Sequence, residues 1–107
     1  MEKFVEQTLL YDFYGELLTK HQKEIYEQAV LEDYSLSEIA RDAGISRQGV
    51  HDMIRRCNHT LEEYENKLHL VDKFLNIRKQ IKSIKELADQ YHADEIAELS
   101  NEILEEL

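Results

Sequence analysis

The stretch Ser35–Cys57, SLSEIARDAGISRQGVHDMIRRC, predicts two helices joined by a sharp turn. Ser35 and Glu38 have the spacing of a capping box, in which the serine hydroxyl accepts from a first-turn amide and the glutamate reaches back, so a short helix begins here. Gly44 stands where that helix must end, and glycine takes the left-handed conformation of a helix terminus most easily. Ser46 then caps a second helix. This spacing is typical of a helix-turn-helix.

The apolar residues inside the stretch fit the same geometry. Ala40 is small, as expected where two helices cross, and Ile45 is expected to fill the angle between them. Val50 and Met53 are expected to anchor the second helix from beneath. We therefore predict an all-α fold built on a helix-turn-helix without a wing. The stretch resembles the helix-turn-helix of sigma-factor region 4, which has the same serine-led helix, glycine turn and serine-capped second helix.

The outward face of the second helix carries the candidate nucleic-acid-binding residues, which are Arg47, Gln48, His51, Asp52, Arg55 and Arg56. Gln48 can pair with an adenine edge, and Arg47 or Arg55 with guanine or phosphate. Asp52 can accept from cytosine N4 or repel a phosphate, and the amides at the start of the helix suit a phosphate. The alternative is a solvated polar face that binds a protein or nothing.

The distribution of charge gives evidence both for and against nucleic-acid binding. The chain of 107 residues has a formal net charge of −10, yet residues 41–59 carry a net charge of +2. Residues 1–40 and 60–107 each carry −6. Because nucleic-acid affinity comes largely from displaced counterions, an acidic body weakens it within the Debye length of about 8 to 10 Å. Any DNA binding is therefore expected to be weak and sensitive to salt.

Helices are expected along the rest of the chain, which contains no proline and only three glycines. Apolar spacing predicts a first helix over 2–18, a second from the Thr19 capping box to about Leu31, and a last helix from Ala93 or Asp94. The aromatic residues of the first helix, namely Tyr11, Phe13 and Tyr14, are expected in the core.

Two apolar stripes with steps of three and four follow the helix-turn-helix, one starting at Ile54 and the other at Phe74. They are out of phase, which places a helix break around 66–70. The domains are accordingly predicted as a helix-turn-helix domain over 1–68, with the recognition helix at about 47–66, and a helical extension over 69–107. The stripes fit packing within one chain or a homodimer, and the sequence leaves both open.

Catalysis and metal binding find little support. Cys57 is the only cysteine, so one chain can hold neither a disulfide nor a thiolate zinc cluster, and the five histidines show no metalloprotease spacing. Neither a glycine-rich phosphate loop nor a nucleophile motif is present. We expect no enzyme activity, cofactor or metal. The lack of long apolar runs and of a basic leader predicts a cytoplasmic protein without membrane association.

The whole chain resembles the YlxM family of small bacterial helix-turn-helix proteins. The residues that carry the resemblance are Asp12–Tyr14, Asp33–Leu36, Glu38–Ala40, Ser46–Gln48 and Leu61–Leu70. The resemblance implies a regulatory protein in the signal recognition particle pathway and no enzyme. It leaves two partner classes open. In one, the partner is DNA, and a dimer places two second helices in successive major grooves and regulates transcription. In the other, the helix-turn-helix is an interaction module that contacts the particle's RNA or its protein subunit and does not bind DNA.

Overall fold

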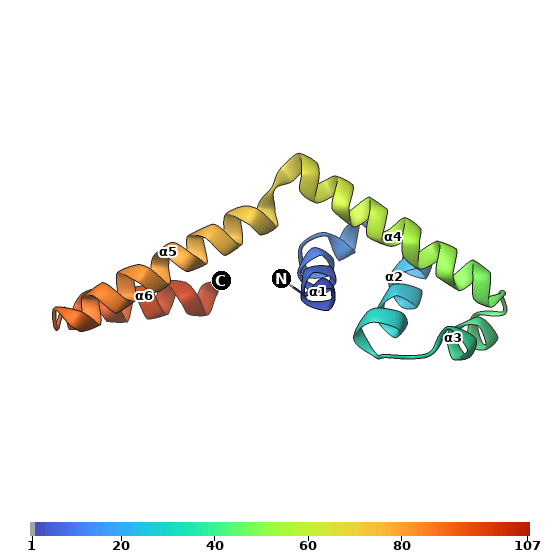
Figure 1. The fold of residues 1–107 in the computed structure, drawn as a ribbon, viewed down its shortest axis with the longest axis horizontal. Coiled ribbons are helices and arrows are strands. Elements are labelled where there is room, and N and C mark those ends of the chain that lie inside the picture. Colours follow the sequence, from blue (N-terminus) through green and yellow to red (C-terminus); the bar gives the residue numbers. More distant parts are fainter. Residues whose placement is uncertain (1) are drawn as a thin grey trace. The chain divides into compact units, whose positions relative to one another are not determined.

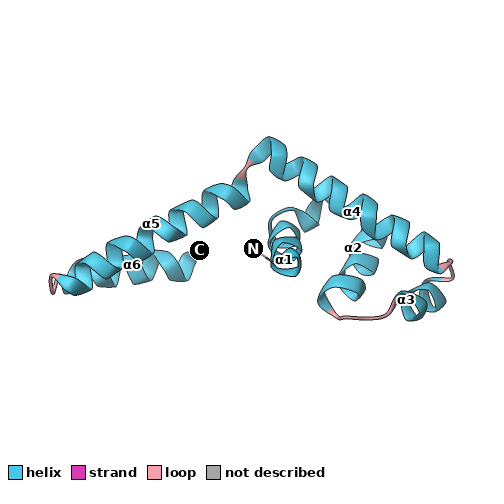
Figure 2. Ribbon diagram, in the orientation of Figure 1, coloured by secondary structure: helices cyan, strands magenta, loops and turns pink. Residues whose placement is uncertain are grey.

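The computed structural model describes residues 2–107, which form helices and no β-strand (Figure 1). The α-helices are α1 Lys3–Tyr14, α2 Lys20–Tyr26, α3 Leu36–Ala43, α4 Arg47–Leu68, α5 Leu70–Gln90 and α6 Asp94–Glu106. Figure 2 shows that the loops between them are short. The all-α prediction is confirmed. The chain forms two compact units, one extending through His69 and the other Leu70–Leu107.

The capping signals of the sequence are present as predicted. The Thr19 side chain accepts from the amide of Gln22, while the Gln22 side chain accepts from the amide of Thr19. Ser35 and Glu38 form the same reciprocal pair at the start of α3, and the hydrogen bonds from Ser35 lower the pKa of Glu38. These bonds satisfy amides that a helix start would otherwise leave unpaired.

Two helix ends differ from the prediction. The first helix ends at Tyr14 and continues only as a 3-10 turn over Gly15–Leu17. A Cβ at Gly15 would lie 2.8 Å from the ring of Tyr11, so this close approach of ring and backbone requires glycine. The second helix ends at Leu31 as predicted, but its last turn, Glu27–Leu31, is a π-helix. This π-helical turn was not predicted, because capping signals and apolar periodicity do not show whether a helical amide bonds to the fourth or the fifth preceding carbonyl.

The helix-turn-helix packs around a small core of Ile25, Ile39, Ala40 and Val50, with Met53 among the residues packed against it. Gly44 has φ of 71°, and its amide donates to the carbonyl of Ala40, so it ends α3 in the left-handed conformation that was predicted. Ile45 was expected to fill the angle between the two helices, but it remains 36% exposed and is not part of this core.

Tyrosines fasten α1 and α2 to α4. The hydroxyl of Tyr14 donates to Glu65 at 2.6 Å, and that of Tyr26 donates to Asn58 at 2.6 Å. Tyr11 stacks on Tyr26 and donates to Glu27. Burial raises the pKa of both Tyr11 and Tyr26, so these phenols stay protonated donors.

Phe13 corrects the prediction that all three aromatics of α1 lie in the core. It is 36% exposed, whereas Tyr14 is 1% exposed. Adjacent residues of a helix point in directions about 100° apart, so α4 covers only one of the two.

The predicted helix break is confirmed at His69, which ends α4 with φ of 56°. In the second unit α5 and α6 lie side by side as a helical hairpin (Figure 1). Ile81, Ala88 and Ser100 are buried in this unit. The second apolar stripe of the sequence thus lies on α5.

Replacing Gly44 tests the turn. Nothing lies within 4 Å of a Cβ built there, so Gly44→Ala should cost only the left-handed backbone, about 1 kcal/mol of the free energy of unfolding. Gly44→Asn should cost less, because asparagine tolerates this conformation. Urea unfolding followed by circular dichroism measures both. Equal losses for the two variants would contradict a conformational origin.

Candidate nucleic-acid interface

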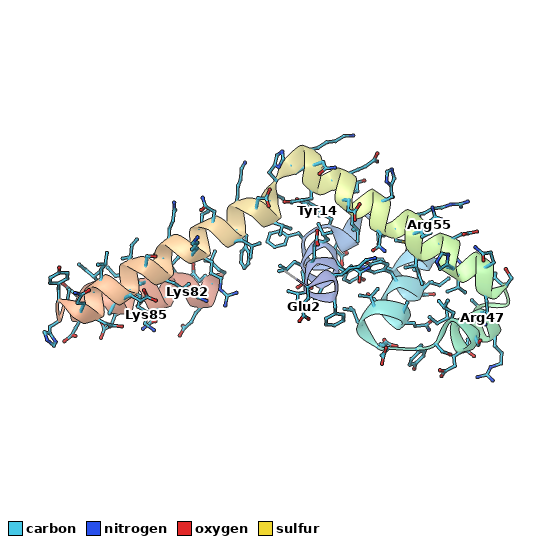
Figure 3. All side chains as sticks on the ribbon, in the orientation of Figure 1. Glu2, Tyr14, Arg47, Arg55, Lys82 and Lys85 are labelled. Carbon is cyan, nitrogen blue, oxygen red and sulfur yellow. The ribbon has the colours of Figure 1, made fainter. Side chains whose placement is uncertain are left out.

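The cap at Ser46 sets where the candidate surface begins. Its hydroxyl accepts from the amide of Gly49 at 2.9 Å, which starts α4 at Arg47. Arg47 and Arg55 lie on this helix about two turns apart (Figure 3). The local sequence therefore fixes both where the recognition helix starts and which residues occupy its first turns.

The six predicted site residues all lie on α4. Five of them are exposed and Asp52 is about half exposed. Arg47, His51 and Arg55 follow one another at spacings of four residues, so they share one face, with Gln48 and Asp52 beside them. Val50 is fully buried on the opposite side of the helix. The helix-turn-helix core therefore turns this polar face outward.

Asp52 organises the centre of the surface. Its Oδ1 accepts from Nε2 of Gln48 at 3.0 Å and lies 3.8 Å from Nδ1 of His51. The Gln48 amide is thus engaged within its own helix, and pairing with an adenine edge would require it to leave Asp52. The carboxylate also brings a negative charge to the middle of a face otherwise suited to phosphate.

The three arginines of the surface keep their guanidinium groups available. Within residues 2–107, Arg47, Arg55 and Arg56 form no ion pair, whereas Arg41 lies 4.0 Å from Asp42. An unpaired, exposed guanidinium can bind phosphate or guanine with two parallel hydrogen bonds. The surface thus has donors that are not committed elsewhere in the chain.

An open groove of about 1070 Å³ adjoins the arginines, between α1, α2 and α4. Arg55 and Arg56 line it together with Lys3 of α1 and His59 of α4. Neither Lys3 nor His59 was among the predicted site residues. The position of His59 one turn after Arg55 was a usable signal, but nothing local to Lys3 indicates that α1 reaches this helix.

Beneath this surface α4 is held by uncharged contacts. Cys57 is fully buried, and burial raises the pKa of its thiol, so it is a packing residue rather than a nucleophile. One residue further along, Oδ1 of Asn58 accepts from Tyr26 and, at 3.3 Å, from Gln7. These contacts fix the rotation of α4 about its axis.

The turn at Gly44 between α3 and a serine-capped α4, whose first turns expose a polar face, defines a helix-turn-helix protein. Residues 1–103 match the model of the family UPF0122, described as "Putative helix-turn-helix protein, YlxM / p13 like". The chain belongs to this family. No enzyme activity is part of that description. Among residues 2–107, none of the helices combines the length and apolar character needed to cross a membrane.

Relatives match over most of their lengths. A UPF0122 protein of Caldanaerobacter subterraneus subsp. tengcongensis is 53% identical over 79% of this chain and 73% of its own length. One of Thermoanaerobacter sp. (strain X514) is 42% identical over 99% of this chain and 94% of its own. One of Bacillus velezensis is 40% identical over 100% and 97%.

Removing the cap should destabilise the helix that carries the surface. Ser46→Ala leaves the Gly49 amide without its side-chain acceptor, which should lower the free energy of unfolding by about 1 kcal/mol. Ser46→Asn, which can cap equally well, should stay within a few tenths of a kcal/mol of the original protein. Thermal unfolding of the three proteins measures this. An Asn variant as unstable as the Ala variant would contradict the capping role.

Proposed function

We propose that this protein is a regulatory protein that binds nucleic acid through α3, the Gly44 turn and α4. The observation that carries the proposal is the set of unpaired, exposed arginines on the first turns of α4. In a helix-turn-helix this end of the second helix enters the major groove, while the helix before it crosses the backbone. Arg47 and Arg55 supply the main contacts, and Arg56 lies toward the groove between the helices.

Phosphate contacts are expected to dominate the affinity. Arg47 adjoins the capped start of α4, where backbone amides and the helix dipole also favour an anion. Arg55 is positioned for either a guanine edge or a phosphate. Because the chain carries a net charge of −10, we expect modest affinity that falls steeply as salt rises.

The pathway is part of the proposal. The resemblance to the YlxM family implies a role with the signal recognition particle, so the particle's RNA is the first nucleic acid to test, beside genomic DNA. An RNA helix is recognised mainly through its backbone and shape, which suits a surface rich in arginine and poor in free amide side chains.

A second candidate function follows from Asp52. This carboxylate occupies the centre of the surface and engages Gln48, which favours a basic protein partner over a base edge. In that case the helix-turn-helix is a protein-interaction module that contacts the protein subunit of the particle. The acidic remainder of the chain would then speed association through opposite potentials.

Substituting the two exposed arginines tests the first function. Arg47→Ala with Arg55→Ala should lower affinity for the bound nucleic acid about tenfold or more and should reduce the slope of log K against log salt by about two. The measurement is fluorescence anisotropy with the particle's RNA and with fragmented genomic DNA, over a salt series.

The matched control removes two charges elsewhere. Arg78→Ala with Lys82→Ala changes the net charge equally on exposed positions of α5 and should leave most of the affinity in place. Circular dichroism should show unchanged helicity in both double variants. Equal losses for the two pairs would mean that only overall charge matters, which would remove the support for a site on α4.

Substituting Asp52 separates the two functions. Asp52→Ala removes the central negative charge and releases Gln48, so it should strengthen nucleic-acid binding several-fold. If the partner is a basic protein, the same change should weaken that complex instead. Titrations of the variant against the particle's RNA and against its protein subunit give opposite signs for the two functions. No change with either ligand would contradict both assignments of Asp52.

A further inference from the structure

The hairpin formed by α5 and α6 has little core of its own. Ile81 and Ala88 are its buried apolar residues beyond the first turn of α5, and Ser100 is the buried residue of α6. Units of fewer than about 40 residues usually need a metal, disulfides or association to be stable, and Leu70–Leu107 falls in this range. Something must cover the apolar surface that the hairpin leaves exposed.

That surface consists of eight large apolar side chains with exposed fractions between 42% and 73%. On α5 and its end they are Ile77, Ile84, Leu87 and Tyr91, and on α6 and its end they are Ile96, Leu99, Ile103 and Leu107. These eight side chains form the hairpin face.

Both stripes lie on one side of the hairpin. Ile77 and Ile84 stand four residues before and three after the buried Ile81, and Ile96 and Ile103 stand four before and three after the buried Ser100. Each stripe is therefore rotated in the same sense from the line where the helices touch. Because α5 and α6 are antiparallel, equal rotations bring both stripes to the same face.

We propose that the hairpin face binds the hairpin face of a second copy of this chain, forming an antiparallel four-helix bundle. The area supports this partner. The eight side chains together expose on the order of 800 Å², which equals the roughly 800 Å² that each partner buries in a protein complex of standard size. A continuous apolar face of this size on a small protein marks an interaction site.

The heights of the residues match under a two-fold axis parallel to the helices. Counted outward from the helix ends at Gln90 and Asp94, Leu87 and Leu99 differ by two residues and Ile84 and Ile103 by three, so each pair lies within one helical turn in height. This axis sets α5 of one copy over α6 of the other, so each of these pairs meets across the interface. Tyr91 with Ile96 and Ile77 with Leu107 complete four apolar layers.

Electrostatic repulsion favours the two-fold axis parallel to the helices over a two-fold axis that runs across them. The edge of the hairpin face on α6 is acidic, with Glu95, Glu102 and Glu106, and α6 contains no basic residue. A two-fold axis across the helices would stack α6 on α6 and bring these edges together, which like charges oppose. Under the axis parallel to the helices they instead adjoin the α5 edge, which is uncharged around Gln80 and Ser83.

The basic residues of α5 do not interrupt the hairpin face. Lys82 and Lys85, labelled in Figure 3, are one and four residues beyond Ile81, which turns them away from the exposed stripe. Lys82 and Lys85 thus lie on a different side of α5 from the hairpin face, whereas Lys73, four residues before Ile77, continues the exposed stripe at its N-terminal end. This arrangement leaves a dry interface flanked by polar residues, as in stable homodimers.

Analytical ultracentrifugation of the full chain tests the proposal. The protein should sediment at twice its chain mass of 12.7 kDa at micromolar concentration. Leu87→Lys with Leu99→Lys should shift it to the single-chain mass. Leu17→Lys with Leu31→Lys, which changes two exposed leucines of the first unit, should leave the dimer intact. A single-chain mass for the original protein at all concentrations, or a dimer that survives the Leu87 and Leu99 changes, would overturn the proposal.

Engineered cysteines test the arrangement even if the lysine variant fails to fold. Gln80→Cys with Glu106→Cys should give a covalent dimer on oxidation, because these edges meet only between copies, and the native Cys57 is buried. Glu102→Cys alone should give none. The opposite pattern would mean that α6 packs on α6, and no cross-link in either variant would refute a dimer through this face. These outcomes do not depend on nucleic-acid binding.

Discussion

The burial of one stripe of α4 is the interaction on which the first unit depends. Val50, Cys57 and Leu61 are all fully buried, and they follow one another at steps of seven and four, so they form a single line along the helix. α1, α2 and α3 each pack against this helix. Since the buried line and the arginines belong to the same rigid helix, the core that stabilises the unit also decides which side chains face outward.

The polar face of α4 combines features that oppose one another. Unpaired arginines and a capped helix start favour an anion, while Asp52 and the acidic remainder of the chain disfavour one. If nucleic acid is the partner, as we propose, this balance of charges predicts weak, salt-dependent binding whose affinity is sensitive to single charges. The groove beside α4 is of mixed charge, because Lys3, Arg55 and Arg56 line it together with Glu6, Asp52 and Glu62.

The two units use the same apolar period with different results. In the first unit the stripe of α4 is covered by three helices, whereas in the hairpin only part of the α5 and α6 surface is covered. The small residues Ala88 and Ser100 let α5 and α6 approach closely, and this closeness leaves the larger Ile, Leu and Tyr side chains outside the contact. A second hairpin has the period and the area to cover them.

Most of the features that could be predicted from the sequence alone depend on interactions between residues close together in the chain. The caps at Thr19, Ser35 and Ser46 and the left-handed Gly44 depend on neighbouring residues only, and all were predicted. The break near His69 was predicted from the change of phase between the two apolar stripes. The outward direction of the polar face of α4 followed from its period. Tertiary packing decided the exposure of Phe13 and Ile45, the π-turn at Glu27–Leu31 and the groove that Lys3 and Arg55 both line. They depend on which distant helix occupies a given face, and a periodic pattern records that a face is buried without recording what buries it.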